Sequence, residues 1–215
     1  MIKGVIFDLD GVIVSTDNLH YKAWKKIADE EGIYFDYQIN DRLRGVSRMD
    51  SIEIIMERAT RKYSQEEKFA LAEKKNGFYV ESLGCLSEKD LLPGVKETLT
   101  NLKAMGIKIA LGSASKNAKT ILNYIGLGDA FDAVSDGNNI TKGKPDPQVF
   151  LMAAEMLGLE PTVCAVVEDS SAGIEAAIRG GMKPFAVGAA ATEMIAGANN
   201  LGNVFELIDH VKCGG

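Results

Sequence analysis

Short apolar runs rich in β-branched residues recur along the chain, and each run is continuous rather than broken by alternating polar residues. The clearest cover residues 4–7, 107–111 and 163–167, with weaker runs at 131–134 and 184–187. Continuous apolarity over so few residues is typical of strands that are buried on both faces of a parallel sheet. This feature limits more strongly than any other what the chain can fold into.

Stretches with the helical spacing of apolar residues separate these runs. They predict helices over residues 95–102, 118–125, 149–157 and 174–178. Strands and helices that alternate at this spacing are typical of α/β proteins. We therefore expect an α/β fold whose core is a doubly wound, Rossmann-like parallel sheet.

The segment 15–90 interrupts this alternation. It holds more than half of the charged residues and contains no run typical of a buried strand. We predict an α/β core domain formed by residues 1–14 and 91–215, with an all-helical domain inserted at 15–90 and a turn at 92–94 where the chain returns to the core. The amphipathic helices expected in the insertion cover residues 19–28, 51–59 and 66–83.

Composition excludes several classes of protein. The 215 residues include 24 Lys and Arg against 30 Asp and Glu, a formal net charge of −6, and 46% are hydrophobic. Such a chain is neither disordered nor a binder of nucleic acid or anionic membrane surfaces. Its three cysteines form no CxxC pair, and no apolar stretch is long enough to cross a bilayer. We expect a cytoplasmic protein.

Polar residues follow the expected strands. Asp8 and Asp10 come after the first strand, residues 113–117 (Ser-Ala-Ser-Lys-Asn) after the second, and Glu168 and Asp169 after the third. Lys144 precedes a helix expected to start near residue 146. Parallel strands in an open sheet place such residues at one edge, where ligands bind. The four segments are therefore expected to meet.

Four acids at one edge are unstable together unless a cation compensates them. Carboxylate oxygens suit Mg²⁺, which binds through a few carboxylates, phosphate oxygens and water. Lys144 adds a positive charge, while Ser113 and free N–H groups at a helix start can hold phosphate oxygens. These groups predict phosphoryl transfer, in which one aspartate can be the nucleophile and a second the general acid and base.

Each of these residues also has a simpler interpretation. An aspartate after a strand commonly forms an Asx turn, and Asp169 or Ser170 could cap the next helix. The arrival of four such segments at one edge favours a functional site over four independent turns.

The residues Phe7-Asp8-Leu9-Asp10-Gly11-Val12, Ser113, Lys144 and Glu168-Asp169 resemble the four motifs of the haloacid dehalogenase superfamily. The helical insertion after the first motif resembles the helical cap of one of its subclasses. Within the superfamily the chain is most similar to the β-phosphoglucomutase family. The residues that carry this similarity are Thr16, His20, Trp24, Arg44-Gly45-Val46-Ser47-Arg48, Lys75 and Ser113-Ala114-Ser115-Lys116-Asn117.

The resemblance implies roles for the acids. Asp8 would carry the phosphoryl group, and Asp10 would be the general acid and base toward sugar hydroxyls. Mg²⁺ would touch the Asp8 carboxylate, the Asp10 carbonyl and Asp169, with Glu168 near or in its coordination shell.

The resemblance also implies how substrate is held. Ser113, Ala114 and Lys144 would hold the transferring phosphate, and Arg48 would hold a second phosphate together with Ser115, Lys116 and Asn117. Thr16 would lie at the cap hinge, and His20 with Lys75 would couple cap closure to Asp10. The other residues expected at the substrate are Leu9, Trp24, Arg44, Gly45, Val46, Ser47 and Ser51.

The cap residues have alternative interpretations. His20 could be solvated, and Trp24 could pack the cap interior rather than face a sugar. Arg48 could cap or solvate the helix expected near residue 51. Lys75 belongs to the run Glu73-Lys74-Lys75, which on composition alone is a solvated helix face.

Three functions remain open from the sequence. The resemblance implies a mutase that interconverts β-D-glucose 1-phosphate and D-glucose 6-phosphate through an aspartyl-phosphate and β-glucose 1,6-bisphosphate, which is both intermediate and activator. A phosphatase of the same superfamily and a non-catalytic sugar-phosphate sensor are the alternatives. The expected partners are hexose phosphates, and a cap that must move favours a monomer.

Overall fold

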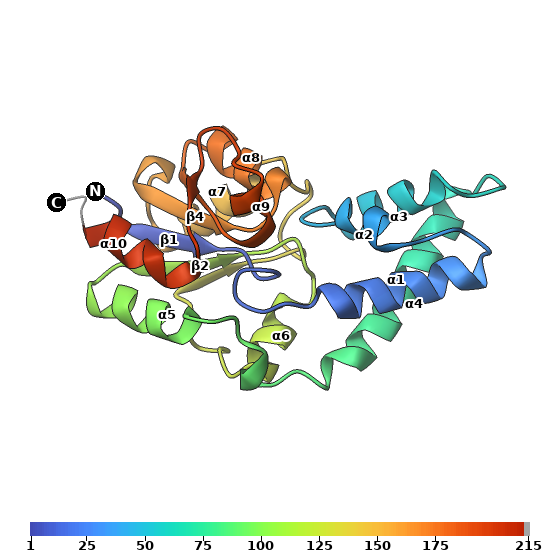
Figure 1. Cartoon of the computed structure of the whole chain (residues 1–215), viewed down its shortest axis with the longest axis horizontal. Helices are drawn as coiled ribbons and strands as arrows, with labels where there is room; N and C mark the ends of the chain where they lie inside the picture. Colours follow the sequence, from blue (N-terminus) through green and yellow to red (C-terminus); the bar gives the residue numbers. More distant parts are fainter. Residues whose placement is uncertain (213–215) are drawn as a thin grey trace.

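A six-stranded parallel sheet forms the centre of the computed structural model, which describes residues 1–212 (Figure 1). The strand order is β3-β2-β1-β4-β5-β6, so the chain runs outward from β1 in both directions. The carboxyl end of β1 therefore lies at the point where the strand order reverses, which is where open α/β sheets bind ligands. The strands are β1 (Gly4–Phe7), β2 (Lys108–Gly112), β3 (Ala133–Ser135), β4 (Cys164–Glu168), β5 (Lys183–Ala186) and β6 (Asn199–Asn200).

Helices cover both faces of this sheet. Side chains of β1 point alternately to the two faces, so Val5 and Phe7 belong to one apolar core and Ile6 to the other. Helices α5, α6 and α10 pack on the first face, and α7 and α8 on the second. These helices and the short α9 are α5 (Val95–Ala104), α6 (Ala118–Tyr124), α7 (Gln148–Leu157), α8 (Ser171–Arg179), α9 (Gly188–Thr192) and α10 (Leu207–Lys212).

The predicted doubly wound α/β sheet is confirmed, with shifts at the strand ends. The run at 107–111 becomes β2 at 108–112, and the run at 163–167 becomes β4 at 164–168. The register explains both shifts, because Gly4 pairs with Lys108 on one side and Cys164 on the other. Pairing with β1, rather than apolarity, sets where each neighbour begins. Strand β6 and the short helices α9 and α10 were not predicted.

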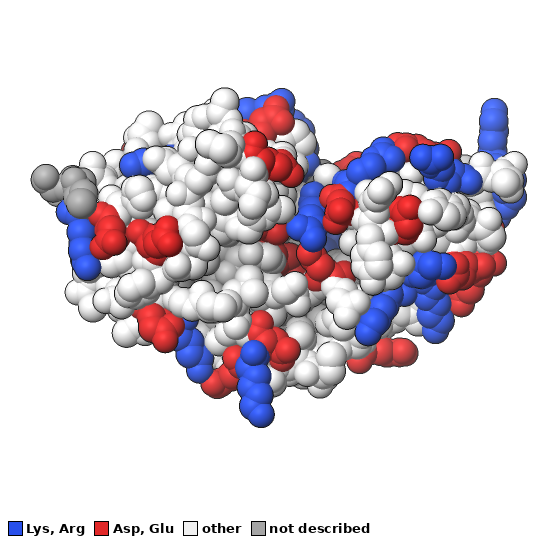
Figure 2. Space-filling model, viewed as in Figure 1, with Lys and Arg blue, Asp and Glu red and all other residues white. Residues whose placement is uncertain are grey.

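Four helices form a separate layer beyond the carboxyl ends of the strands, at the right of Figure 1. We call them the cap helices. They enclose an apolar cluster of their own that includes Trp24, Phe35, Ile52 and Ile55. Figure 2 shows Lys and Arg interspersed with Asp and Glu over their surface. The cap helices are α1 (Asp17–Glu30), α2 (Tyr37–Asp41), α3 (Arg48–Met56) and α4 (Gln65–Leu83).

The chain enters and leaves the cap helices through two segments that lie side by side. Val14 forms an isolated antiparallel bridge with Leu91, and the Leu92 N–H donates to the Ile13 carbonyl over 3.0 Å. The domain limits at 14/15 and 90/91 stay a prediction. None of the described helices is long and apolar enough to cross a membrane.

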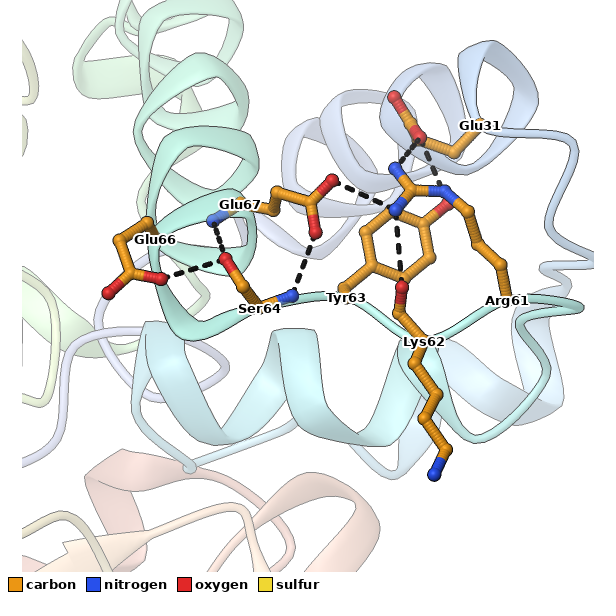
Figure 3. A network of polar contacts seen from close by, with 7 residues as sticks. All are labelled: Glu31, Arg61, Lys62, Tyr63, Ser64, Glu66 and Glu67. Atoms are coloured by element: carbon orange, nitrogen blue, oxygen red, sulfur yellow. Dashed lines mark hydrogen bonds and ion pairs between the residues drawn. The ribbon is translucent and has the colours of Figure 1, made fainter.

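A polar network fixes the start of α4, as Figure 3 shows. The Ser64 side chain accepts from the Glu67 N–H while Glu67 accepts from the Ser64 N–H, which is a capping box. Arg61 links this capping box to the end of α1, because its guanidinium lies 2.8 Å from the Glu67 carboxylate and 3.6 Å from the Glu31 carboxylate. The long α4, which carries Lys75, is thereby held against α1.

Candidate active site

A cavity of about 330 Å³ lies between the carboxyl edge of the sheet and the cap helices. Its walls bring together all four segments that follow the predicted strands. The predicted site residues that line it are Asp8, Asp10, His20, Trp24, Arg44, Gly45, Val46, Ser47, Arg48, Ser51, Lys75, Ser113, Ala114, Ser115, Lys116, Asn117, Lys144 and Asp169.

The loop after β1 turns sharply and carries both aspartates into the cavity. The Asp8 N–H donates to the Val167 carbonyl of β4 over 3.0 Å, which extends the sheet by one residue. Gly11 has φ +76°, a conformation that favours glycine, and a Cβ there would overlap the Asp169 carboxylate. Glycine therefore allows the loop to approach Asp169 closely.

Lys144 is buried between two carboxylates. Its Nζ donates to Asp8 Oδ1 over 2.5 Å and also to Glu168 Oε1. The second oxygen of Glu168 accepts from the N–H and from the hydroxyl of Ser170, each over 2.8 Å. Burial alone would lower the pKa of Lys144, but Asp8 and Glu168 raise it above its ordinary value. Lys144 is thus a fixed positive charge beside Asp8.

One lysine cannot balance the acids that gather here. Burial raises the pKa of Asp8 and of Asp169, and neighbouring carboxylates, Glu168 among them, add to both shifts. The part that neighbouring carboxylates add to these shifts indicates negative charge that Lys144 does not offset and that a divalent cation would relieve. Among residues 1–212, no three His, Cys, Asp or Glu side chains gather to hold a metal by themselves. The predicted set fits Mg²⁺ nonetheless, since it combines carboxylates with a backbone carbonyl and leaves positions for phosphate and water.

Asp10 is held by the first residues of the cap. The Thr16 hydroxyl donates to Asp10 Oδ1, and the Tyr79 hydroxyl of α4 donates to Thr16 over 3.3 Å. Burial raises the pKa of Asp10 to about 6, although the hydrogen bond from Thr16 opposes this shift. A carboxyl group whose pKa lies near neutrality can both release and take up a proton, as a general acid and base must.

His20 and Lys75 form a buried pair in the cap wall of the cavity. Lys75 Nζ lies 2.8 Å from His20 Nδ1, and 4.9 Å and 4.5 Å from the ring centres of Trp24 and Tyr79. Burial lowers the pKa of His20 well below its ordinary value, so the ring is neutral and can accept from Lys75. The solvated-face interpretation of 73–75 is wrong for Lys75, which is only 3% exposed.

Replacing Lys75 with Met is expected to change how stability depends on pH. Burial lowers the pKa of Lys75 from 10.5 to about 7, with Arg48 acting in the same direction. Above pH 7 the unfolded chain therefore keeps a proton that the folded chain has lost, so the free energy of unfolding rises with pH. Between pH 7 and pH 9 the unsubstituted protein should gain about 2 kcal/mol relative to Lys75→Met. Urea unfolding at both pH values measures this, and equal pH dependence in the two proteins would contradict it.

The segment after β2 forms a compact loop of hydrogen-bond donors. The Ser115 N–H donates to Ser113 Oγ over 3.1 Å, and the Asn117 N–H donates to Ser115 Oγ over 3.2 Å. Ser113 is 2% exposed. Asn117 precedes α6, whose first N–H groups have no partners within the helix. The N–H groups of Ser115 and Asn117 are thus engaged within the loop, and Ser113 and Lys116, which line the cavity, carry the hydroxyl and the charge that could hold an anion.

Asn76 and Gly45, both from the inserted segment, contact residues at the sheet edge. Arg48 donates to Asn76 Oδ1 over 2.9 Å, and Asn117 Nδ2 donates to the same oxygen over 2.9 Å. Gly45, at φ +72°, lies so close to Ser170 that a Cβ would be 2.6 Å from the Ser170 hydroxyl. Arg44 pairs with Asp17 over 2.7 Å at the rim.

Three predicted site residues do not line the cavity. Leu9 is fully buried in the core. Thr16 and Glu168 do not reach the cavity themselves, but Thr16 hydrogen-bonds Asp10 and Glu168 hydrogen-bonds Lys144, which do. Trp24 packs in the cap core, as one of its two interpretations predicts, and it also lines the cavity. Contact between Trp24 and a sugar stays a prediction.

The structure adds residues that the sequence analysis missed. The one available signal was helical spacing, because Tyr79 lies four positions after Lys75 on α4 and so shares its face. The missed polar and aromatic residues that line the cavity are Asp17, Asn40, Phe69, Glu73, Asn76, Tyr79, Thr141 and Lys142.

Comparisons with known proteins find chains that are similar along most of their length. The family model of haloacid dehalogenase-like hydrolases matches residues 2–181. A β-phosphoglucomutase from Bacillus subtilis (strain 168) is 45% identical over 200 residues, which span 92% of this chain and 88% of the relative. The phosphorylated carbohydrates phosphatase of Thermotoga maritima is 32% identical over 185 residues, spanning 85% of this chain and 83% of the relative.

A solved structure extends the likeness to three dimensions. The crystal structure of a β-phosphoglucomutase from Clostridium difficile superposes with a TM-score of 0.90 and 38% sequence identity. The superposition covers 99% of this chain and 96% of that chain, so it includes the cap helices as well as the sheet.

Proposed function

The chain belongs to the haloacid dehalogenase-like hydrolase family, and we propose that within it the protein interconverts β-D-glucose 1-phosphate and D-glucose 6-phosphate. It would act in the cytoplasm on free hexose phosphates, as a monomer. One observation carries the proposal beyond the family: a single cavity is lined both by Asp8, Asp10 and Lys144 and by the cationic Arg48 of the cap. The proposed phosphoryl-transfer site and the proposed second anion site would thus share one cavity.

We propose that the protein depends on Mg²⁺, because carboxylates of this site gather around a single buried lysine. Asp8, the Asp10 carbonyl and Asp169 would hold the ion, and Glu168, predicted near it, contacts Lys144 and Ser170. When bound, Mg²⁺ would neutralise charge on the transferring phosphate and on these acids.

The first half of the reaction uses a phosphorylated Asp8. The 6-hydroxyl of β-glucose 1-phosphate attacks the phosphorus of the aspartyl-phosphate, and Asp10 takes up the hydroxyl proton as the bond to Asp8 breaks. The product is β-glucose 1,6-bisphosphate with a free Asp8 carboxylate. Lys144 and the donors of residues 113–114 stabilise the charge on the phosphoryl group in transit.

The second half runs in the opposite sense on the other phosphate. The bisphosphate turns so that its 1-phosphate faces Asp8, which attacks the phosphorus. Asp10 donates its proton to the leaving sugar oxygen, which releases glucose 6-phosphate and restores the aspartyl-phosphate. In either orientation the second phosphate would lie against Arg48, Ser115, Lys116 and Asn117.

Phosphorus NMR tests the function directly. The purified protein is mixed with Mg²⁺, β-glucose 1-phosphate and a trace of β-glucose 1,6-bisphosphate. Formation of glucose 6-phosphate that ceases when Mg²⁺ is chelated supports the proposal. Inorganic phosphate as the product would instead identify a phosphatase, and no reaction would leave only a binding role.

Replacing Arg48 with Ala is expected to slow the mutase reaction by about tenfold to a hundredfold, because a charge-assisted contact to the second phosphate is lost. Hydrolysis of a small ester such as p-nitrophenyl phosphate has no second phosphate and should change far less. Both rates are measured on one preparation. An equal loss in the two assays would contradict this division of roles.

A further inference from the structure

Glu73 places a carboxylate on the arginine that would bind the second phosphate. Arg48 Nη1 donates to Glu73 Oε1 over 2.5 Å, and Nη2 donates to Asn76 Oδ1 over 2.9 Å. Both outer nitrogens of the guanidinium are therefore engaged. Glu73 also lines the cavity, so this contact faces the space that a ligand would enter.

The two partners of Arg48, Asn76 and Glu73, differ in charge and in what else they contact. Asn76 is neutral and accepts from Asn117 of the core as well as from Arg48, so its oxygen aligns the cap and core halves of the anion site. Glu73 is charged and belongs to the cap alone. Its side chain is 48% exposed, against 18% for Arg48, so it can rotate into solvent.

A phosphate that approaches Arg48 must compete with this carboxylate. Ion pairs with a half-exposed partner are weak, whereas a phosphate dianion offers three acceptor oxygens and can bind a guanidinium through two of them. The phosphate therefore displaces Glu73 from Arg48. Its binding free energy is smaller than it would be at an arginine without an ionic partner. When the phosphate leaves, Glu73 is adjacent and takes its place.

We propose that Glu73 is an exchange partner for Arg48: it weakens the hold on the second phosphate and so speeds release of the bisphosphate, which must let go of Arg48 in order to turn. Glu73 is thus a residue that sets affinity and release rate, and it touches no reacting atom. The inference rests on the proposed function in one respect, that Arg48 binds the second phosphate.

The test measures binding without turnover. Each variant is built on Asp8→Asn, which removes the nucleophile, and is titrated with β-glucose 1,6-bisphosphate. The single tryptophan, Trp24, lines the same cavity and reports binding through its fluorescence. Glu73→Gln keeps an acceptor without the charge, and Glu73→Ala removes both.

Both variants are expected to bind the bisphosphate about two- to fivefold more tightly, with the gain in a slower dissociation rate measured by stopped-flow displacement. Glu81→Gln makes the same change of charge on an exposed position of α4 that does not line the cavity, and it should leave affinity unchanged. Unchanged or weaker binding in Glu73→Gln would overturn the proposal, as would a dissociation rate equal to that of the parent.

A failure of the proposed function would look different. If Arg48→Ala left bisphosphate affinity unaltered, the second anion site itself would be wrong. If Arg48→Ala weakened binding while Glu73→Gln failed to strengthen it, only the role proposed for Glu73 would be wrong.

Discussion

Replacing Asp8 with Asn is expected to abolish turnover, with a loss of at least about 10⁴-fold. Two neighbouring acids have other partners. Asp10 accepts from Thr16, and both oxygens of Glu168 accept from Lys144 and Ser170. Asparagine has nearly the same shape, so Lys144 keeps an oxygen to donate to and the fold should be retained.

Two measurements check this result. Phosphorus NMR follows glucose 6-phosphate, and intact-protein mass spectrometry after incubation with the bisphosphate detects the covalent phosphoryl group on the unsubstituted protein only. Asp129→Asn is the matched control, because Asp129 is exposed and does not line the cavity. Turnover or phosphorylation that survives in Asp8→Asn would rule out Asp8 as the nucleophile.

Replacing Lys144 with Met is expected to lower the free energy of unfolding by about 3–5 kcal/mol and to remove activity. Lys144 is 3% exposed and is the cation between Asp8 and the fully buried Glu168. Methionine leaves these carboxylates without their shared partner in a buried site. The pKa of Asp8, which burial already raises, should rise further, so the destabilisation should shrink as pH falls and this acid becomes protonated.

Urea unfolding at pH 7.5 and pH 5 measures the loss of stability and its pH dependence, and the glucose 6-phosphate assay measures the loss of activity. Lys142→Met is the control, since Lys142 is 70% exposed and lies 3.6 Å from Asp146. A surface pair of this kind contributes about 0–1 kcal/mol. If Lys144→Met cost no more than Lys142→Met, or cost more at pH 5 than at pH 7.5, the charge argument for Lys144 would be wrong.

The core half of the site could be predicted because local sequence and topology agree there. Asp8 and Asp10 follow β1, residues 113–117 follow β2, and Asp169 follows β4. Parallel pairing of these strands with β1 forces their carboxyl ends to one edge. Continuous apolar runs therefore determine both the sheet and the place where its acids meet.

The cap half could not be predicted in the same way. On α4, composition suggested one solvated face for Glu73, Lys74 and Lys75, yet Lys75 is buried against His20 and Glu73 contacts Arg48. Helical spacing says which residues share a face, but it does not say what that face meets. The same limit explains why Asn76 was missed, since its partners come from α3 and from the loop before α6.

By itself, then, the order of apolar runs and the residues just after them determined the parallel sheet, the inserted helices and the group of acids with Lys144. Only the packing of the cap helices over the sheet decided which cap side chains face those acids. Strand pairing carries neighbouring segments to a common edge by backbone hydrogen bonds that any sequence shares. The contacts among Arg48, Glu73, Asn76 and Asn117 depend instead on how the cap helices pack on each other and against the sheet.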